Sequence, residues 1–200
     1  MCLALPKLSF TLRTCPPIHI REAIASFDLT MFESVSDLVG GSLSDWSWLK
    51  ASLPVSLGGL GTRWASLYAP ATFLASLDQS KELVSGILGH SPPASGHLVS
   101  TLQDLISGTG RNDWCSIESV DVPLRQHALS KVIDQACFNR LLDQAPDTRA
   151  KALTLSTAIP HAGDWLHVVP SSALGLHFHD QEFCHCLQYW LGGANAGGGV

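Results

Sequence analysis

The glycine-rich stretch from Leu53 to Gly61 constrains the fold of this chain more than any other feature. It has the sequence LPVSLGGLG, and three of its last four residues are glycine. Such a backbone must turn tightly, or approach another backbone so closely that a Cβ atom would clash. A tryptophan-rich helical segment at 44–52 precedes it, and a second helix-like run begins near Arg63. The stretch lacks the lysine of a phosphate-binding loop, which argues against a nucleotide site.

Few residues of this chain are charged. Charged residues make up 14% of the 200 residues, against about 25% in an average soluble domain. The net charge of −5 arises entirely after residue 63, because residues 1–63 hold five basic and five acidic side chains. The low charge predicts that a partner covers some apolar surface. The alternative is an ordinary soluble domain whose surface is rich in serine and glycine.

Proline and glycine positions, together with apolar residues spaced by three and four, predict a mostly α chain: an irregular multi-helix array with at most one short β element. One short extended segment is expected at 174–179, a linker at 89–96, and a disordered Gly/Ala tail at 192–200. Pro16-Pro17 and Pro70 are expected to end helices, and Asp180 to cap the last one. The expected helices are 3–14, 18–39, 44–52, 62–69, 71–88 (as one helix, or as two with Asp78 between them), 97–106, 124–144, 146–158 and 181–191.

The remaining global features predict an intracellular protein, in the cytoplasm or the nucleus. The first residues form no basic leader followed by an apolar core, so no signal peptide is expected. No run of 18 apolar residues occurs, so neither a transmembrane segment nor a membrane partner is expected. The six cysteines are predicted to be reduced thiols.

Catalytic and metal-binding patterns are weak. The pairs His177/His179 and Cys184/Cys186 place soft ligands close together, and the sequence leaves open whether they bind zinc. If Cys184 and Cys186 lie on a helix, however, they point in opposite directions, so no metal site is assigned. No hydrolase Gly-x-Ser-x-Gly motif and no Asp-Asp pair occurs. The segment 161–165 (HAGDW) is interpreted as a structured loop in which His161 and Asp164 bond to backbone groups and Trp165 packs on the core.

Three basic residues are the candidates for binding nucleic acid. Lys7, Arg13 and Arg21 lie around the helix–Pro-Pro–helix corner at the start of the chain. Such a corner presents cations to a phosphate backbone. An ordinary solvated face with balancing acids explains them equally well.

Several ordered stretches together carry a resemblance to a known family. These stretches resemble the region that follows the polymerase palm in non-LTR (LINE-like) retrotransposon reverse transcriptases, over roughly residues 3–191. No single motif is specific, and the order of the set carries the resemblance. The stretches are Leu5–Pro17, Trp48–Gly61, Tyr68–Ser76, Pro160–Pro170 and Leu174–Phe178.

The resemblance implies a division of the chain and a role for it. Residues 1–61 would be a thumb-like helical segment, 62–145 connector helices and 146–191 a terminal helical segment. The parent family is an RNA-directed DNA polymerase, but its palm aspartates have no counterpart in this sequence. The expectation is therefore a non-catalytic fragment, not an enzyme, with no catalytic residue and no cofactor. It would contact nucleic acid weakly, or bind palm and fingers domains or another protein, and take no small-molecule substrate. The alternative from the residues alone is a helical protein-interaction module with an exposed apolar and tryptophan surface.

Overall fold

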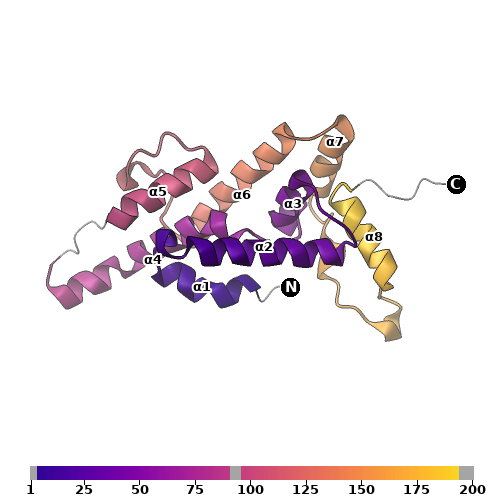
Figure 1. Ribbon diagram of the computed structural model, residues 1–200, viewed down its shortest axis with the longest axis horizontal. Coiled ribbons are helices and arrows are strands. Elements are labelled where there is room, and N and C mark those ends of the chain that lie inside the picture. The colour runs from indigo at the N-terminus through magenta and orange to yellow at the C-terminus, as the bar shows by residue number, and fades with distance from the viewer. Residues whose placement is uncertain (1–3, 91–95, 194–200) are drawn as a thin grey trace. The chain divides into compact units, whose positions relative to one another are not determined.

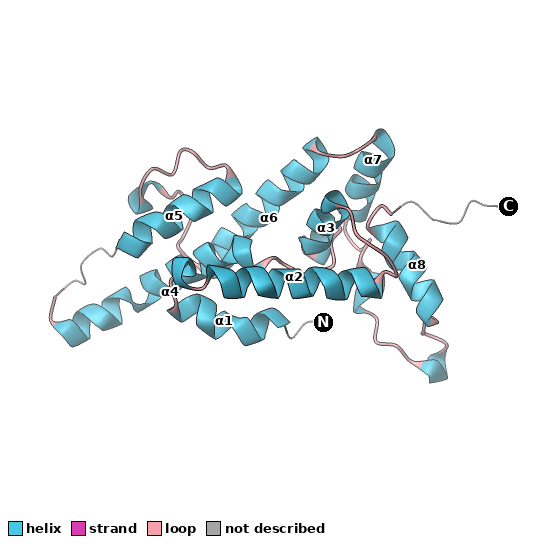
Figure 2. Cartoon of the chain, viewed as in Figure 1, coloured by secondary structure: helices cyan, strands magenta, loops and turns pink. Residues whose placement is uncertain are grey.

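The chain is mostly α, as predicted (Figures 1 and 2). The computed structural model describes residues 4–90 and 96–193, with side chains from Leu8 onward. Within these residues no β-strand occurs, and the only β pairing is an isolated antiparallel bridge between Ser171 and Leu176. Short 3-10 turns connect several helices: η1 (Pro17–His19), η2 (Val55–Leu57), η3 (Ile117–Ser119), η4 (Asp164–His167) and η5 (Ser172–Leu174). The described α-helices are α1 (Ala4–Thr14), α2 (Arg21–Leu38), α3 (Asp45–Ser52), α4 (Ala65–Leu88), α5 (Gly96–Thr109), α6 (Gln126–Asp143), α7 (Thr148–Thr157) and α8 (Asp180–Trp190).

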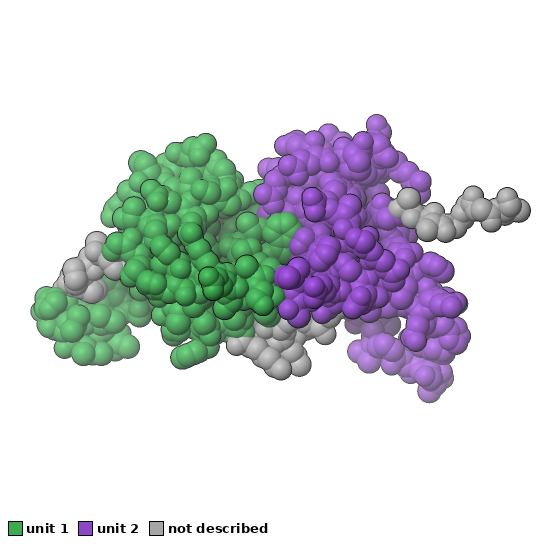
Figure 3. Space-filling model, in the orientation of Figure 1, with its two compact units in different colours: residues 1–28, 64–136 green, residues 29–63, 137–200 purple. Residues whose placement is uncertain are grey.

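The chain forms two compact units, each built from two separate stretches (Figure 3). Unit 1 comprises residues 1–28 and 64–136, and unit 2 comprises residues 29–63 and 137–200. The helices α2 and α6 each contribute residues to both units. This grouping differs from the consecutive segments 1–61, 62–145 and 146–191. The thumb, connector and terminal roles given to those segments stay predictions.

Unit 1 is built around α4, against which α1 and α5 pack. Its apolar cluster joins Leu12 of α1 and Ile24 of α2 to Ala65 and Ala69 of α4. The predicted break at Pro16-Pro17 is confirmed, since α1 ends at Thr14 and η1 begins at Pro17. Proline cannot continue an α-helix because it lacks the N–H and its ring clashes with the preceding turn.

The predicted break at Pro70 is wrong, because α4 runs through it as one helix. Pro70 removes one backbone hydrogen bond, to Ser66, at the sixth residue of the helix. Buried side chains on both sides, such as Tyr68 and Phe73, stabilise the helix against that loss. The first turn also gains an outside cap: Asp28 accepts hydrogen bonds from the backbone N–H of Ala65 at 2.7 Å and of Ser66 at 3.0 Å.

Unit 2 packs α3, α8 and the end of α2 around one apolar cluster. Val35, Val39 and Ala51 meet Leu187, Trp190 and Leu191 in this cluster. The cap of α3 is Ser44, whose hydroxyl accepts from the Ser47 N–H at 3.1 Å. Two polar bonds tie α8 to the end of α2: Cys184 Sγ donates to the Leu38 carbonyl at 3.0 Å, and Gln188 Nε2 to that of Val39 at 2.6 Å.

Several predicted helix ends move by a few residues. The helix α5 continues past Gly108 and ends before Gly110, which has φ +71°. The N-cap of α7 is Asp147, so Pro146 precedes the helix and does not lie in its first turn. Asp180 belongs to the first turn of α8, and His179 caps that helix in a capping box with Glu182.

Two further sequence predictions fall partly outside the structure. Gly89 ends α4 with φ +73°, as the predicted linker requires, but residues 91–95 of that linker lie outside the described residues. Residues 194–200 of the predicted disordered tail also lie outside them. Across the described residues, no helix combines the length and the apolar character needed to cross a bilayer.

Candidate functional site

The predicted nucleic-acid residues lie in unit 1, but one of them is already paired. Arg21, at the start of α2, donates to both carboxylate oxygens of Asp104 on α5, at 3.2 Å each. Its side chain remains 61% exposed, so the ion pair is a surface one. Arg13 is exposed in the last turn of α1, and the side chain of Lys7 lies outside the described residues. Asp104 therefore offsets one of the three predicted cations.

A pair of histidines lies beside this corner. The rings of His19 in η1 and His97 at the start of α5 are 4.8 Å apart, edge to face. Together with the Arg21–Asp104 pair, this contact joins η1 and the start of α2 to α5. No local sequence pattern indicates either contact, because α5 lies more than seventy residues further along the chain.

The glycine-rich stretch is a structural loop of unit 2. A Cβ atom on Gly59 would overlap the carbonyl oxygen of Leu53, and Gly58 has φ +81° beside Thr157. The loop folds back on α3 through hydrogen bonds from the N–H of Leu60 to Ala51 at 3.1 Å and of Gly61 to Leu53 at 2.8 Å. The prediction of a tight turn with close backbone approach is confirmed. The glycines are needed for the packing of this loop against α3.

Next to this loop, α3 carries a buried lysine. Lys50 has no exposed surface, and among the described residues no atom hydrogen-bonds its Nζ. Its ammonium lies 5.7 Å from the ring centroid of Trp46, a distance at which a cation–π attraction acts. Burial lowers the pKa of Lys50 to about 8. The sequence places this lysine on a short amphipathic helix and does not reveal its burial.

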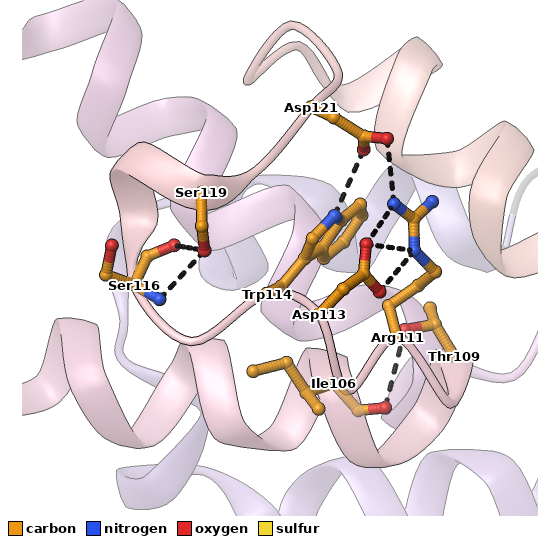
Figure 4. Close-up of polar contacts among 8 residues, drawn as sticks. All are labelled: Ile106, Thr109, Arg111, Asp113, Trp114, Ser116, Ser119 and Asp121. Atoms are coloured by element: carbon orange, nitrogen blue, oxygen red, sulfur yellow. Dashed lines mark hydrogen bonds and ion pairs between the residues drawn. The ribbon is translucent and has the colours of Figure 1, made fainter.

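The segment 110–121 of unit 1 is tied together by a polar network (Figure 4). Arg111 donates to Asp113 at 2.7 Å and to Asp121 at 2.8 Å. Its guanidinium lies 4.6 Å from the ring centroid of the fully buried Trp114, whose indole N–H donates to Asp121 at 3.0 Å. The hydrogen bonds from Arg111 hold the pKa of Asp113 and of Asp121 below the usual range.

The charged and polar side chains of this network find their hydrogen-bond partners within it. Both carboxylates pair with the same guanidinium, and the indole N–H has an acceptor, so the ion pairs and the ring together fix the loop on the core. Ser116 and Ser119 close the next turn with hydrogen bonds of 2.9 Å and 2.7 Å (Figure 4). We therefore interpret the network as a structural brace. The nearness of Arg111 and Asp113 in sequence was its only detectable signal.

The weak metal pattern does not converge. The rings of His177 and His179 are 5.6 Å apart, but Cys184 bonds to the Leu38 carbonyl of α2. No group of three or more metal-ligating side chains occurs in the described parts of the chain. His161 and Asp164 bond to each other at 2.9 Å, which corrects the expectation that they bond to backbone groups.

An open hollow lies on the surface of unit 2. Aromatic side chains dominate its lining, and its volume is about 470 Å³, within the range of ligand pockets. Trp165 meets Phe178 at 6.1 Å and Trp190 at 5.7 Å between ring centroids, both nearly perpendicular. The lining residues are Trp165, Phe178, His185, Cys186, Tyr189 and Trp190.

Exposed apolar side chains occur in the same unit as the hollow. The connecting segment before α8 leaves Val169 80% and Leu174 74% exposed, and Phe178 and Tyr189 are half-exposed at the hollow itself. None of the six tryptophans is exposed: Trp114 and Trp190 are buried and the other four are half-buried. The expectation that tryptophans are exposed on the surface is therefore wrong, whereas exposed aliphatic residues are present.

The sequence contains one signal for this hollow. Five aromatic residues cluster between positions 165 and 190, although their neighbours in sequence place them separately in a loop and a helix. The hollow forms because η4, the residues before α8, and α8 itself bring them together. Comparison with other proteins adds nothing to this picture, since no family model, curated protein or solved structure matches the chain.

Proposed function

We propose that this chain is a non-catalytic helical binding module that docks onto another protein through unit 2. The observation that carries the proposal is the run of exposed aliphatic side chains in the segment before α8, led by Val169 and Leu174, in the unit that also holds the aromatic hollow. Large apolar side chains grouped in this way on a surface are typical of a protein interface. The low charged fraction of the chain supports the same interpretation.

This role is compatible with the resemblance to the post-palm region of non-LTR reverse transcriptases. The resemblance implies a portion without catalytic carboxylates whose thumb packs against a primer–template duplex, and palm and fingers domains are candidate protein partners of such a portion. The resemblance implies a helical thumb, and the mostly α architecture supports the proposal to that extent. We therefore infer that a palm-and-fingers polypeptide is one partner class for this surface.

The test compares the wild-type chain with a double variant, Val169→Ser with Leu174→Ser. We expect the wild type to bind an apolar fluorescent dye and to self-associate at high concentration in size-exclusion chromatography with light scattering. The double variant should lose most of both effects while keeping its helical circular dichroism. A wild-type chain that remains monomeric without binding the dye would rule out the proposal.

A second candidate function is weak contact with nucleic acid through Lys7, Arg13 and Arg21. The exposed Arg13, at the end of α1 before the Pro16-Pro17 corner, favours it. The surface ion pair of Arg21 with Asp104 limits it, because a phosphate must compete with that carboxylate. Binding of a primer–template duplex at low salt, compared with an acidic control protein, is the measurement. Equal binding by wild type and Arg13→Ala, or no binding above the control, would remove this function.

A further inference from the structure

We propose that the solvent face of α1 binds unpaired nucleotides of a single-stranded nucleic acid, with a base stacked on the ring of Phe10 and a phosphate held by Arg13. The inference rests on the second candidate function, weak contact with nucleic acid, and names the form of nucleic acid that this face fits. Phe10 is 76% exposed, more than any other phenylalanine, tyrosine or tryptophan among the described residues. A ring left in water gives up the free energy of its burial, which a bound partner can recover.

Phe10 lies opposite the buried side of its helix. Leu8 and Leu12 are each two residues away from it, so they stand about 160° from Phe10 around the helix axis. Leu12 is buried in the apolar cluster of unit 1, and Leu8 packs against that cluster. The core face of α1 is therefore filled without Phe10, and the ring stands on the solvent side, where it contributes little to the fold.

The charges around Phe10 suit a phosphate. Arg13 follows Phe10 by three residues, so the two are neighbours on the helix surface, and Arg13 is exposed. The first acid of the sequence is Glu22, although the whole chain has a net charge of −5. Asp104, which reaches this corner from α5, is bonded to Arg21. An exposed ring with an arginine one turn away matches the base and the phosphate of a nucleotide, the combination that single-strand-binding surfaces use.

The exposed ring favours a single strand over a duplex. In a duplex the faces of the bases are covered by their neighbours, so a side chain stacks on a base only where the strand is unpaired or ends. A phenylalanine ring has no hydrogen-bonding group, so it stacks on any base and reads no sequence. We therefore expect binding that tolerates changes of sequence and of sugar but requires an exposed base.

An anionic membrane surface is the competing partner for a basic helix with an exposed ring. Helices that lie on membranes bury a whole apolar face in the lipid. In α1 that face is already occupied, because Leu8 and Leu12 pack in unit 1. Phe10 alone offers too little apolar surface to hold a helix in lipid, whereas one ring and a nearby cation are enough to hold a nucleotide. The face of α1 therefore favours a nucleic acid.

The test measures binding of labelled oligothymidylate and oligouridylate to the full chain by fluorescence anisotropy at low salt. Phe10→Leu keeps an apolar side chain but removes the π face, so it should weaken binding of both strands about fivefold or more, whereas Phe10→Trp should retain it. Arg13→Gln should also weaken binding, and it should lower the slope of log affinity against log salt by about 0.7. The matched controls are Leu83→Ala, at a 69% exposed position of α4, and Arg149→Gln, an exposed arginine of α7, and both should leave binding unchanged.

An abasic strand with the same number of phosphates separates stacking from charge attraction, because Phe10→Leu should not change its binding. If Phe10→Leu binds oligothymidylate as tightly as the wild type does while Arg13→Gln does not, phosphate contact remains and the stacking inference is overturned. Vesicles of phosphatidylserine and phosphatidylcholine that bind more tightly than the strands, and lose binding in Phe10→Leu, would overturn it in favour of a membrane. If no nucleic acid binds above an acidic control protein, the candidate function is rejected as well.

Discussion

The two units treat their longest irregular segments in opposite ways. In unit 1, residues 110–121 bury Trp114 completely and pair Asp113 and Asp121 with Arg111. In unit 2, residues 164–179 leave Val169 and Leu174 largely exposed, and Trp165 and Phe178 of the same segment line an open aromatic hollow. Side chains that are already paired are occupied by the fold. The exposed side chains of unit 2 are therefore the better candidates for contacting a partner.

A similar contrast holds for two buried polar groups. In unit 1, Tyr68 donates its phenol O–H to Asp134, and both side chains are buried. In unit 2, the buried ammonium of Lys50 has no hydrogen-bond partner among the described residues and lies near the ring of Trp46. Buried polar groups are stable when they are hydrogen-bonded and costly when they are not. We therefore expect variants in the two units to differ in stability, from the largest effect to the smallest as follows.

Trp114→Ala should destabilise the protein far more than Phe178→Ala. Trp114 is fully buried, so its truncation leaves a cavity and removes one of the hydrogen-bond donors to Asp121, at a cost of about 3–5 kcal/mol. Phe178 is half-exposed and should cost less than about 1 kcal/mol. Urea denaturation followed by circular dichroism measures both. If the two variants lose similar stability, the segment of unit 2 is packed as firmly as that of unit 1, and the comparison is wrong.

Lys50 should make the stability of the protein depend on alkaline pH. Its folded-state pKa of about 8 lies below the unfolded value of 10.5, so the charged form is disfavoured by folding. The cost is fully present below pH 8 and is relieved as pH rises from 8 towards 10.5, by up to about 3 kcal/mol. Lys50→Met should be more stable than wild type at neutral pH and should lack this rise. Denaturation at several pH values tests it, with Lys131→Met, an exposed lysine on α6, as the control. A wild-type stability that falls over that range at the same rate as that of Lys50→Met would mean that the amine is solvated.

Local features of the fold were predictable because they depend on neighbouring residues. Apolar spacing placed α6 correctly, with Leu129, Ile133, Cys137 and Leu141 buried along one face. Gly110 and not Gly108 ends α5, which shows that a glycine alone does not mark a helix end. The close approach at Gly59 was also predictable, since three glycines within four residues are typical of a backbone contact that leaves no room for a Cβ atom.

Features that depend on distant residues were not predictable. Asp28 caps α4 across more than thirty residues, and Asp104 pairs with Arg21 across more than eighty. The helix through Pro70 survives because of tertiary packing, which no local pattern reports. The hollow draws on three separate segments, and only the local excess of aromatic residues pointed to it. Polar pairs between distant residues, and hollows lined by several segments, can be recognised only once the fold is known.

Arg111→Gln should remove part of the acid sensitivity of unit 1. The pKa values of Asp113 and Asp121 are lowered by Arg111, so their contribution is present above an unfolded pKa of about 4 and is lost as pH falls through the folded values. The effect should be smaller than the two above, because both carboxylates are exposed and screened by solvent. Denaturation at about pH 5 and about pH 3 should show a smaller decrease for the variant than for wild type. Arg125→Gln, an exposed arginine nearby in sequence, is the control. Equal decreases for wild type and Arg111→Gln would mean that the brace contributes no acid-labile stability.

The smallest effect on stability should come from Val169→Ser with Leu174→Ser. This double variant tests most directly whether the two units differ in how firmly their irregular segments are packed. Both side chains are largely exposed, so their loss should change the free energy of unfolding by no more than about 0.5 kcal/mol per site. If the residues serve a partner, binding should fall strongly while stability stays the same. Phe10→Ser in unit 1 removes a comparably exposed apolar side chain and should leave dye and partner binding unchanged. A large loss of stability in the double variant would instead show that these residues belong to the core of unit 2, and the contrast between the two segments would disappear.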